Sequence, residues 1–412
     1  MLMDLAQIIG NNVRSLMESR SVTIVELAKA LSISRQTLQN YLKGTNIIDS
    51  VKLVAIADYF SVPVTDLLSE PVTSTNFLFR TALNYQSATD TISAKVMNCI
   101  NSHYNLAKTL GDNVSYFPEQ YNLYVTVDGS TIDINYECNN FFSSKLKITD
   151  ELRHSLMNLA IEQRKKLGIH DTNALAAISI LQQKGINVFF VDMGDPDISG
   201  LSYVDDEKGC YIFVNCNEKI TLERVIFTVF HEYGHIILHR PLYKRKFHDS
   251  KIQNASYNFL DRMANMFAGY FLVPYEYLNN YSDIFNNLHS ITQLFPIKKQ
   301  FQVSLQTLVL SLGNYNYVSQ LFIKNFFNYL NNNNLREIEP EPISELPEIN
   351  QTFSSIKNAK ILASLRTGYQ QDVITKKDIM DILWLDSTSA EQIMQQFSTY
   401  NNSSSIFDAL FN

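Results

Sequence analysis

Residues 231–235 read His-Glu-Tyr-Gly-His, with two histidines four positions apart and an acid beside the first. Side chains four positions apart on an α-helix project from one face, so both imidazoles can reach one metal ion. Neutral imidazole nitrogens are common zinc ligands, and zinc lowers the pKa of a bound water toward neutrality. A neighbouring carboxylate can take the proton of that water. The spacing therefore predicts a hydrolytic zinc site, with His231 and His235 as metal ligands and Glu232 as general base.

A catalytic zinc site needs a third protein ligand. The best candidate lies in the segment 258–274. If this segment forms a helix that packs against the helix of the two histidines, Asp261 falls on its first turns. The small side chains of Ala264 and Ala268 permit the two helices to approach closely. We therefore expect Asp261 to complete the zinc site.

Other side chains stay open as ligands. Asp249 lies in the loop before this segment, and Glu276 lies beyond its end. His239 continues the four-residue series, but it lies one helical turn, about 6 Å, beyond His235. We expect His239 to support the site rather than to bind the metal.

Residues 23–44 predict two short helices joined by a tight turn. Thr23 can cap the first helix, and Glu26 follows three residues later, as in a capping box. Ser34 can cap the second helix, which ends before Gly44. The apolar residues that would pack the two helices together are Leu27, Ala28, Leu31, Ile33 and Leu38.

This pattern resembles the helix-turn-helix of the XRE/Cro repressor family, and the match runs over residues 1–70. Ser32 stands where the family has its turn glycine. The resemblance implies a five-helix DNA-binding domain whose second motif helix enters the major groove. The side chains that it directs toward base edges are Ser34, Arg35, Gln36 and Asn40, and those toward phosphates are Tyr41 and Lys43.

The charge of this module is close to neutral. Residues 1–70 carry six Lys and Arg against seven Asp and Glu, so the formal charge is 6 − 7 = −1. One module can therefore neutralise few phosphates. We expect specific binding of duplex DNA to need a homodimer.

The whole chain carries 34 Lys and Arg against 41 Asp and Glu, a net charge of −7, which argues against a basic nucleic-acid coat or a polybasic membrane anchor. Four cysteines without a CxxC pair exclude a disulfide scaffold, and we expect buried thiols. The first twenty residues do not resemble a signal peptide, and no window approaches 18 uninterrupted apolar residues. These features predict a soluble cytoplasmic protein without a membrane partner.

Scarce Gly and Pro (13 and 10 residues) favour helices. Alternating polar and apolar residues around Asp128-Gly129 predict a β-hairpin of Tyr121–Val127 and Thr131–Tyr136. The apolar runs Ile186–Val191 and Tyr211–Val214 predict strands. The chain should therefore have an α+β fold that is predominantly helical.

The acidic segment 336–349 holds five glutamates and three prolines and follows four asparagines, a composition that predicts a solvated linker. The expected regions are 1–70, the DNA-binding domain; 71–149, a helix and hairpin for dimerisation or sensing; 150–330, the zinc domain; 331–351, the linker; and 352–412, a small helical region.

The phrase VIFTVFHEYGHIILH, followed by DRMANMFAGYFLVP, resembles the ImmA/IrrE family of zinc metallopeptidases. Ser199–Asn215 and Phe301–Tyr315 also fit the family pattern, so the resemblance covers about residues 150–330. It implies a gluzincin-like domain with a small antiparallel sheet, His231 and His235 as zinc ligands and Glu232 as base. The family has a glutamate where this sequence has Asp261, which is one methylene shorter.

The two resemblances together imply a DNA-binding transcriptional regulator that carries a zinc-dependent peptidase domain. Such a peptidase commonly cleaves a repressor-type protein and so relieves repression. Two alternatives stay open. One is a transcription factor whose peptidase fold is a non-catalytic sensor of a ligand or metal, and the other is a self-cleaving repressor.

Overall fold

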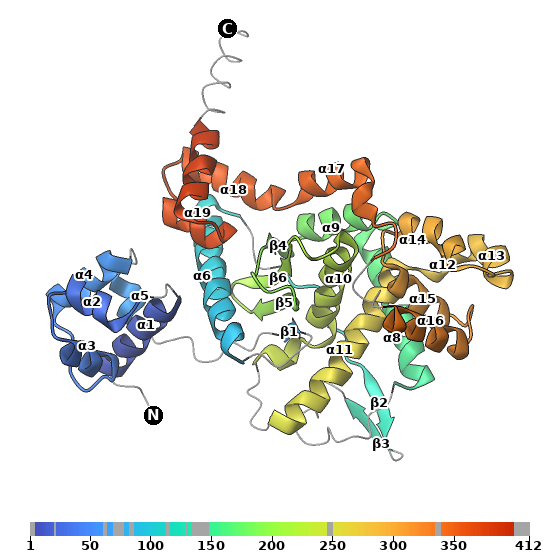
Figure 1. Cartoon of the computed structure of the whole chain (residues 1–412), viewed down its shortest axis with the longest axis horizontal. Coiled ribbons are helices and arrows are strands. Elements are labelled where there is room, and N and C mark those ends of the chain that lie inside the picture. The colour runs from blue at the N-terminus through green and yellow to red at the C-terminus, as the bar shows by residue number, and fades with distance from the viewer. Residues whose placement is uncertain are drawn as a thin grey trace, which may run out of the picture. The chain divides into compact units, whose positions relative to one another are not determined.

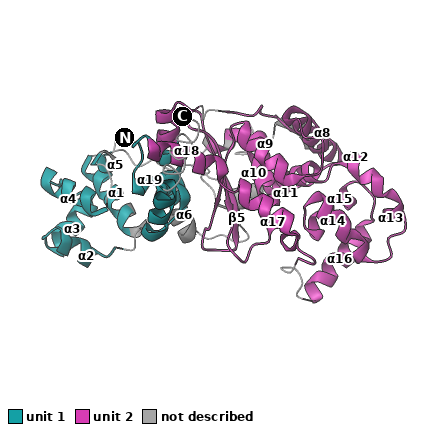
Figure 2. Cartoon of the chain, turned by 90° about the horizontal axis from the view of Figure 1, so that it is seen from above, with its two compact units in different colours: residues 1–75, 84–103, 371–412 teal, residues 76–83, 104–370 magenta. Residues whose placement is uncertain are grey.

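Helices dominate the part of the chain that the structure describes, where one small sheet and a hairpin accompany them, which confirms a mostly helical α+β class (Figure 1). The computed structural model describes residues 5–19, 22–60, 64–68, 78–81, 86–112, 116–127, 130–133, 148–244, 250–333 and 339–398. Two compact units divide the chain, one of residues 1–75, 84–103 and 371–412 and the other of residues 76–83 and 104–370 (Figure 2).

Five helices form the N-terminal module: α1 (Leu5–Ser19), α2 (Ile24–Ala30), α3 (Arg35–Leu42), α4 (Ser50–Phe60) and α5 (Val64–Leu68). Thr23 and Glu26 form the reciprocal capping box of α2, and Ser34 caps α3 by accepting a hydrogen bond from the Thr37 N–H. Ser32 lies in the turn between α2 and α3 with φ 53°, a conformation that glycine adopts most easily.

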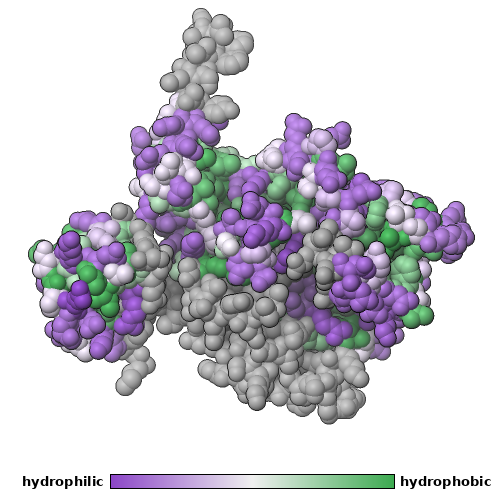
Figure 3. All heavy atoms as spheres, viewed as in Figure 1, coloured by the Kyte–Doolittle hydropathy of each residue, from purple (hydrophilic) through white to green (hydrophobic). Residues whose placement is uncertain are grey.

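The core of this module draws apolar side chains from all five helices, including Leu27, Leu31 and Leu38. Burying these faces against one another supplies most of the stability of such short helices. Large apolar side chains are also exposed, among them Ile47 and Val51. Figure 3 shows hydrophilic and hydrophobic side chains mixed on the face of the module that is in view.

Further helices contribute to the first unit. The long helix α6 (Gln86–Leu110) passes from the first unit to the second at His103, and α19 (Lys376–Leu383) lies wholly in the first. The Cys99 thiol of α6 is buried and donates a hydrogen bond to the Ile382 carbonyl. Residues 387–398 are also helical.

A four-stranded sheet lies in the second unit, with the order β1 (Leu78–Thr81), β5 (Ile198–Asp205), β6 (Gly209–Asn215), β4 (Asn187–Val191). The strand β5 is antiparallel to both β1 and β6, but β4 runs parallel to β6. The sheet is therefore mixed rather than wholly antiparallel, because β4 pairs with β6 and not with β5, the strand that follows it.

The hairpin of β2 (Tyr124–Val127) and β3 (Ser130–Asp133) forms where the alternating pattern predicts one, with Val127 paired to Ser130. The first strand begins at Tyr124 rather than at Tyr121 and is therefore shorter than expected. Asp128 and Gly129, the expected turn residues, lie outside the described residues, as do residues 134–136.

The helix α10 (Leu222–Leu238) packs against β5 and β6 and also against α11 (Ser250–Leu272), which in turn packs on α8 (Asp150–Leu167) (Figure 1). Both α10 and α11 therefore belong to the core of the second unit. The other helices of this unit are α9 (Ala174–Gln183), α12 (Tyr275–Leu278), α13 (Ser282–Asn286), α14 (Phe295–Phe301), α15 (Leu305–Asn314), α16 (Gln320–Asn332), α17 (Pro347–Ile356) and α18 (Ala359–Gln370).

Residues 339–351 of the acidic segment after α16 do not form the solvated linker that their composition predicts. Ile343 has no exposed surface and belongs to the core. The ammonium group of Lys298, also fully buried, lies 2.8 Å from Glu339 and 3.2 Å from Glu223 of α10. The segment folds inward because a buried lysine needs carboxylate partners, and Glu339 supplies one of them.

The outer strand β4 is flanked by the junction of α17 and α18. Asn358 adopts the left-handed conformation there, with φ 54°. Its side-chain amide accepts a hydrogen bond from the Phe190 N–H and donates one to the Phe190 carbonyl, both at 2.9 Å. One side chain therefore satisfies both backbone groups of Phe190.

Candidate functional site

The helix α10 brings the imidazoles of His231 and His235 together, with their Nε2 atoms 3.1 Å apart. The Thr221 side chain caps this helix by accepting a hydrogen bond from the Arg224 N–H. Both imidazoles are buried, since His231 has no exposed surface and His235 is 3% exposed. The pair therefore lies at the edge of the packed core, as the apolar residues before it predict.

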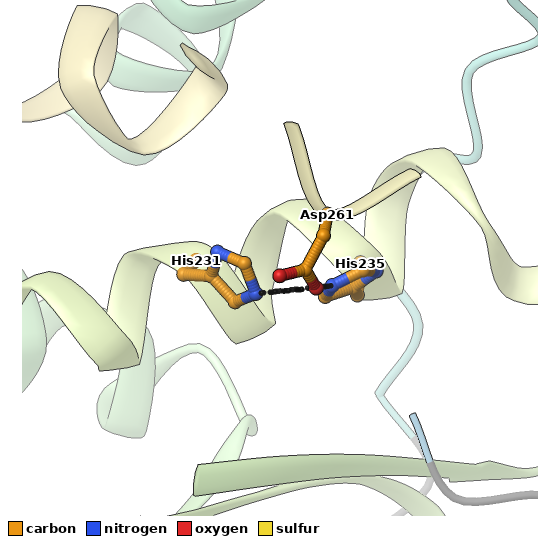
Figure 4. Close-up of side chains that lie close together, drawn as sticks. All are labelled: His231, His235 and Asp261. Atoms are coloured by element: carbon orange, nitrogen blue, oxygen red, sulfur yellow. Dashed lines mark hydrogen bonds and ion pairs between the residues drawn. The ribbon is translucent and has the colours of Figure 1, made fainter. Parts of the chain in front are cut away.

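Asp261 projects from α11 toward the same point (Figure 4). Its Oδ1 atom lies 3.5 Å from the Nε2 atom of His231 and 3.5 Å from that of His235. Around a tetrahedral ion held at about 2.0–2.1 Å, neighbouring ligand atoms lie roughly 3.3–3.4 Å apart. The three donor atoms match this spacing, so the residues fit one zinc-sized ion.

The charge of Asp261 also suits a cation. Burial acts to raise the pKa of its carboxyl group, but the two imidazoles outweigh burial and hold that pKa well below its usual range. The carboxylate is therefore ionised at neutral pH. Its side chain is 35% exposed, so the site has one edge open to solvent.

A close crossing of α10 and α11 lets the short aspartate reach the histidines. A Cβ atom at Gly234 would lie 3.5 Å from the Ala264 Cα atom and 2.9 Å from Cδ1 of Phe267. The absence of a side chain at Gly234 therefore allows the two helices to lie close together.

Hydrogen bonds on the far side of each ring orient the imidazoles. The Nδ1 atom of His231 lies 2.9 Å from Oδ1 of Asn265, which can only accept, so His231 carries its proton on Nδ1 and offers the Nε2 lone pair to a metal. The Nδ1 atom of His235 lies 2.8 Å from that of His239. His239 caps the C-terminus of α10, has no exposed surface and is not one of the three converging donors.

The N-terminal module presents α3 as a partly exposed helix. Its exposed residues and flanks are Ser34, Arg35, Gln36, Gln39 and Lys43. Of the other predicted DNA contacts, Asn40 is half-buried and accepts a hydrogen bond from Gln36 at 3.3 Å, and Tyr41 packs against the core of the module. The Ser34 hydroxyl is committed to the helix cap through Thr37.

Two basic residues of this module contact its own backbone. The Arg14 guanidinium donates to the Leu42 carbonyl at 2.6 Å, and the Lys52 ammonium donates to the Leu31 carbonyl at 2.7 Å. Both carbonyls lie at helix C-termini, where cations are favoured. The exposed cations of α3 and its C-cap are Arg35 and Lys43.

Comparison with known families agrees with both regions. Residues 181–312 match the peptidase M78 family, described as the IrrE N-terminal-like domain, and residues 13–67 match a helix-turn-helix family. The chain joins an XRE-type helix-turn-helix to an ImmA/IrrE-type domain. No curated protein matches the chain. Within the described ranges, each helix is too short or too polar to span a bilayer.

Among the described residues, neither Glu276 nor His239 joins the three donors of the ImmA/IrrE-type domain. Glu276 is exposed on α12 and belongs to no metal-sized group among the described residues. Asp249 lies outside the described residues. Burial and the neighbouring imidazoles lower the pKa of His239 well below its usual value, so this side chain is neutral.

Glu232 of α10 is linked by hydrogen bonds to two residues that sequence analysis did not single out, Ser202 and Tyr243. Its Oε2 atom accepts a hydrogen bond from the Ser202 hydroxyl of β5, and the Ser202 oxygen accepts one from Tyr243 of the short helix η1 (Arg240–Lys244). The strand β5 carries two serines, Ser199 and Ser202, and the sequence does not tell which of them faces α10. One tyrosine among 22 gives no signal either.

Sequence analysis also did not single out Asn265 or Gln39. Asn265 lies four residues after Asp261, so the two share a face of α11, and this spacing could have identified it as a partner of His231. Gln39 lies three residues after Gln36 on α3, which places it on the exposed face of that helix. Both follow from helical periodicity once the helices are assigned.

Proposed function

We propose that this chain is a DNA-binding transcriptional regulator whose ImmA/IrrE-type domain is a zinc-dependent endopeptidase. One observation carries the proposal: Oδ1 of Asp261 is equidistant from the Nε2 atoms of His231 and His235, at the spacing of zinc ligands. Glu232 on the same helix supplies the base that hydrolysis needs.

The zinc would be held by His231, His235 and Asp261, and it would supply a Lewis acid that acidifies water and polarises the scissile carbonyl. Glu232 takes the proton of the attacking water and delivers it to the leaving amine. Asn265 and His239 hold the two imidazoles so that their Nε2 atoms face the metal.

DNA binding is assigned to α3 and its flanks. Arg35, Gln36 and Asn40 reach base edges in the major groove, together with Ser34 at the helix start, and Lys43 and Tyr41 contact phosphates. Since Arg14 and Lys52 are bound to backbone carbonyls, one module offers few cations to the phosphates. Tight operator binding therefore requires a homodimer.

The fusion would place the peptidase beside its regulatory target. A protein substrate of the repressor type, cleaved near the operator, would relieve repression there. The self-cleaving variant of this proposal places the scissile bond in the chain itself, and incubation of the purified chain with zinc, followed by mass spectrometry, separates the two.

A second candidate function is a metal sensor without hydrolysis. It is favoured by burial, because Glu232 and His231 have no exposed surface and a peptide bond must reach both. In a sensor, metal binding would alter DNA affinity, and Glu232→Gln would leave that response unchanged.

The deciding experiment incubates the zinc-loaded chain and its Glu232→Gln variant with a library of quenched-fluorescence peptides, and measures operator binding in parallel. The peptidase proposal expects cleavage by the wild type and none by Glu232→Gln, although both bind zinc. Equal zinc content, no cleavage by either chain and a zinc-dependent change in DNA affinity would establish the sensor instead.

A further inference from the structure

Three side chains from separate elements form a hydrogen-bond chain that ends on Glu232. The Tyr243 hydroxyl donates to Ser202 Oγ at 2.7 Å, and the Ser202 hydroxyl donates to Glu232 Oε2 at 2.5 Å. Ser202 and Glu232 have no exposed surface, and Tyr243 is 7% exposed. The chain is therefore shielded from water, which would otherwise compete for each bond.

The direction of these bonds follows from the tyrosine. Burial, together with the nearby charge of Glu232, raises the pKa of Tyr243 well above its usual value, so the phenol keeps its proton. Its hydroxyl therefore donates to Ser202. Because Ser202 has a single proton, that proton is directed to the carboxylate.

The register between β5 and α10 brings the serine to the carboxylate. A Cβ atom at Gly200 would lie 2.5 Å from Cγ2 of Thr228, so the helix rests directly on the strand there. Two residues along a strand advance about 6.7 Å and four along a helix about 6.0 Å. The next pair on the facing surfaces is therefore Ser202 and Glu232.

The tyrosine is held by its own short helix. Arg240, at the start of η1, donates a hydrogen bond to the Pro118 carbonyl and lies over the Phe117 ring at 5.5 Å from its centre. These contacts anchor η1 and keep Tyr243 against β5.

We propose that Ser202 and Tyr243 are positioning residues for Glu232. This inference rests on the proposed function, in which Glu232 is the general base. Ser202 holds one carboxylate oxygen and so fixes the rotation of the group, which sets the direction in which the second oxygen takes the proton of the attacking water. When that proton arrives, the first oxygen still accepts from Ser202, so no bond of the chain has to break.

The kinetic test compares Ser202→Ala with Ser199→Ala, a buried serine on the same strand that accepts hydrogen bonds from Arg224 instead. With a quenched-fluorescence peptide that the wild type cleaves, Ser202→Ala should lower kcat by about 10- to 100-fold and leave KM and zinc affinity unchanged. Tyr243→Phe should lower kcat by less, and Ser199→Ala should not lower it. Wild-type kcat in Ser202→Ala, or an equal loss in Ser199→Ala, would overturn the proposal.

A second readout needs neither metal nor activity. With 3-fluorotyrosine placed at position 243 of the full chain, the fluorine resonance should move in Ser202→Ala and in Glu232→Gln, and should stay in place in Ser199→Ala. A resonance that none of these changes moves would show that the three groups are not linked, and the proposal would fall. If the wild type cleaves no peptide, the peptidase assignment fails, whereas the fluorine resonance still decides whether the pair orients the carboxylate.

Discussion

Gly234 faces Ala264 where α10 crosses α11, and a Cβ atom at Gly234 would stand only 3.5 Å from the Ala264 Cα atom. This contact limits how closely the two helices that carry His231, His235 and Asp261 can approach each other. Since Asp261 is a methylene shorter than glutamate, its equal distances to both imidazoles depend on the separation of the two helices.

Gly234→Ala should therefore weaken zinc binding by about tenfold, because the added methyl group collides with the buried Phe267 ring and pushes α11 away. Asp261→Glu in the Gly234→Ala background should restore part of the affinity, since the longer side chain spans the wider gap. Competition with a fluorescent zinc chelator measures both. Zinc affinity that Gly234→Ala leaves unchanged would contradict this account of the crossing.

Zinc content should follow the three converging donors. We expect about one zinc per chain, lost in His231→Ala and in His235→Ala. Asp261→Ala should weaken binding by about 1–3 kcal/mol, and Asp261→Glu should retain it. His239→Ala should still bind zinc because its ring contacts His235 and not the metal position. Elemental analysis of dialysed protein measures the zinc content of each variant. Equal zinc in all variants would refute the assignment of these residues as ligands.

DNA binding should respond in two distinct ways to changes on α3. Arg35→Ala and Gln36→Ala should relax sequence preference, whereas Lys43→Ala should weaken binding to all sequences alike and reduce the salt slope by about 1. Lys324→Ala removes the same charge at an exposed position of α16 and serves as control. Fluorescence anisotropy over a salt series provides the measurement. No salt-dependent binding by the wild type at low ionic strength would make the module a protein-interaction domain.

The buried ion cluster should make the acidic segment essential for stability. Lys298→Met leaves Glu223 and Glu339 buried without their cation, and should lower the free energy of unfolding by about 3–5 kcal/mol. Glu339→Gln should cost less, because its amide oxygen can still accept from Lys298 and from the Leu305 N–H. Denaturant titration at pH 7 ranks the two, and the reverse order would be inconsistent with the cluster.

Glu339 also predicts a pH dependence. Burial raises the pKa of this carboxyl group, and the opposing effect of Lys298 is smaller. The carboxyl group of Glu339 therefore keeps its proton to a higher pH in the folded chain than in the unfolded chain. Its contribution to stability is complete below its unfolded pKa, about 4.3, and declines as the pH rises through its folded pKa. Glu339→Gln should remove that decline. The measurement is the difference in unfolding free energy between the two chains from pH 4 to 8.

Thiol reactivity should rise steeply with pH at Cys216. Burial raises the pKa of its thiol to about 11, so the reactive thiolate should increase about tenfold per pH unit between pH 7 and 10. Mass spectrometry of the iodoacetamide-labelled chain measures the rate, with Cys216→Ser as control. A rate that levels off near pH 8.5 would indicate an ordinary exposed thiol.

Features encoded by neighbouring residues could be predicted from the sequence. The capping box of Thr23 and Glu26 and the pairing of His231 with His235 need only helical spacing, which is local. Asp261 could be expected because its helix carries small residues at the spacing that a close crossing requires.

Contacts that tertiary packing brings about could not be predicted from the sequence. Ser202 reaches Glu232 only through the register of β5 on α10, and Tyr243 only through the turn of η1 back toward the strand. The prediction of a solvated linker failed for a related reason. The composition of the acidic segment favours exposure to solvent, but Lys298, some forty residues earlier in the chain, binds Glu339 in the interior. A pattern of residue types does not contain such distant partners.

The Asn358 side-chain amide binds the backbone of β4, a strand at the edge of the sheet. Among the described strands, β4 pairs on one side only, with β6, and an unpaired strand edge can pair with a strand of another molecule. By binding both backbone groups of Phe190, Asn358 occupies a position at which such a strand would pair. Replacing this asparagine would therefore expose the Phe190 N–H and carbonyl to pairing with a strand of another molecule.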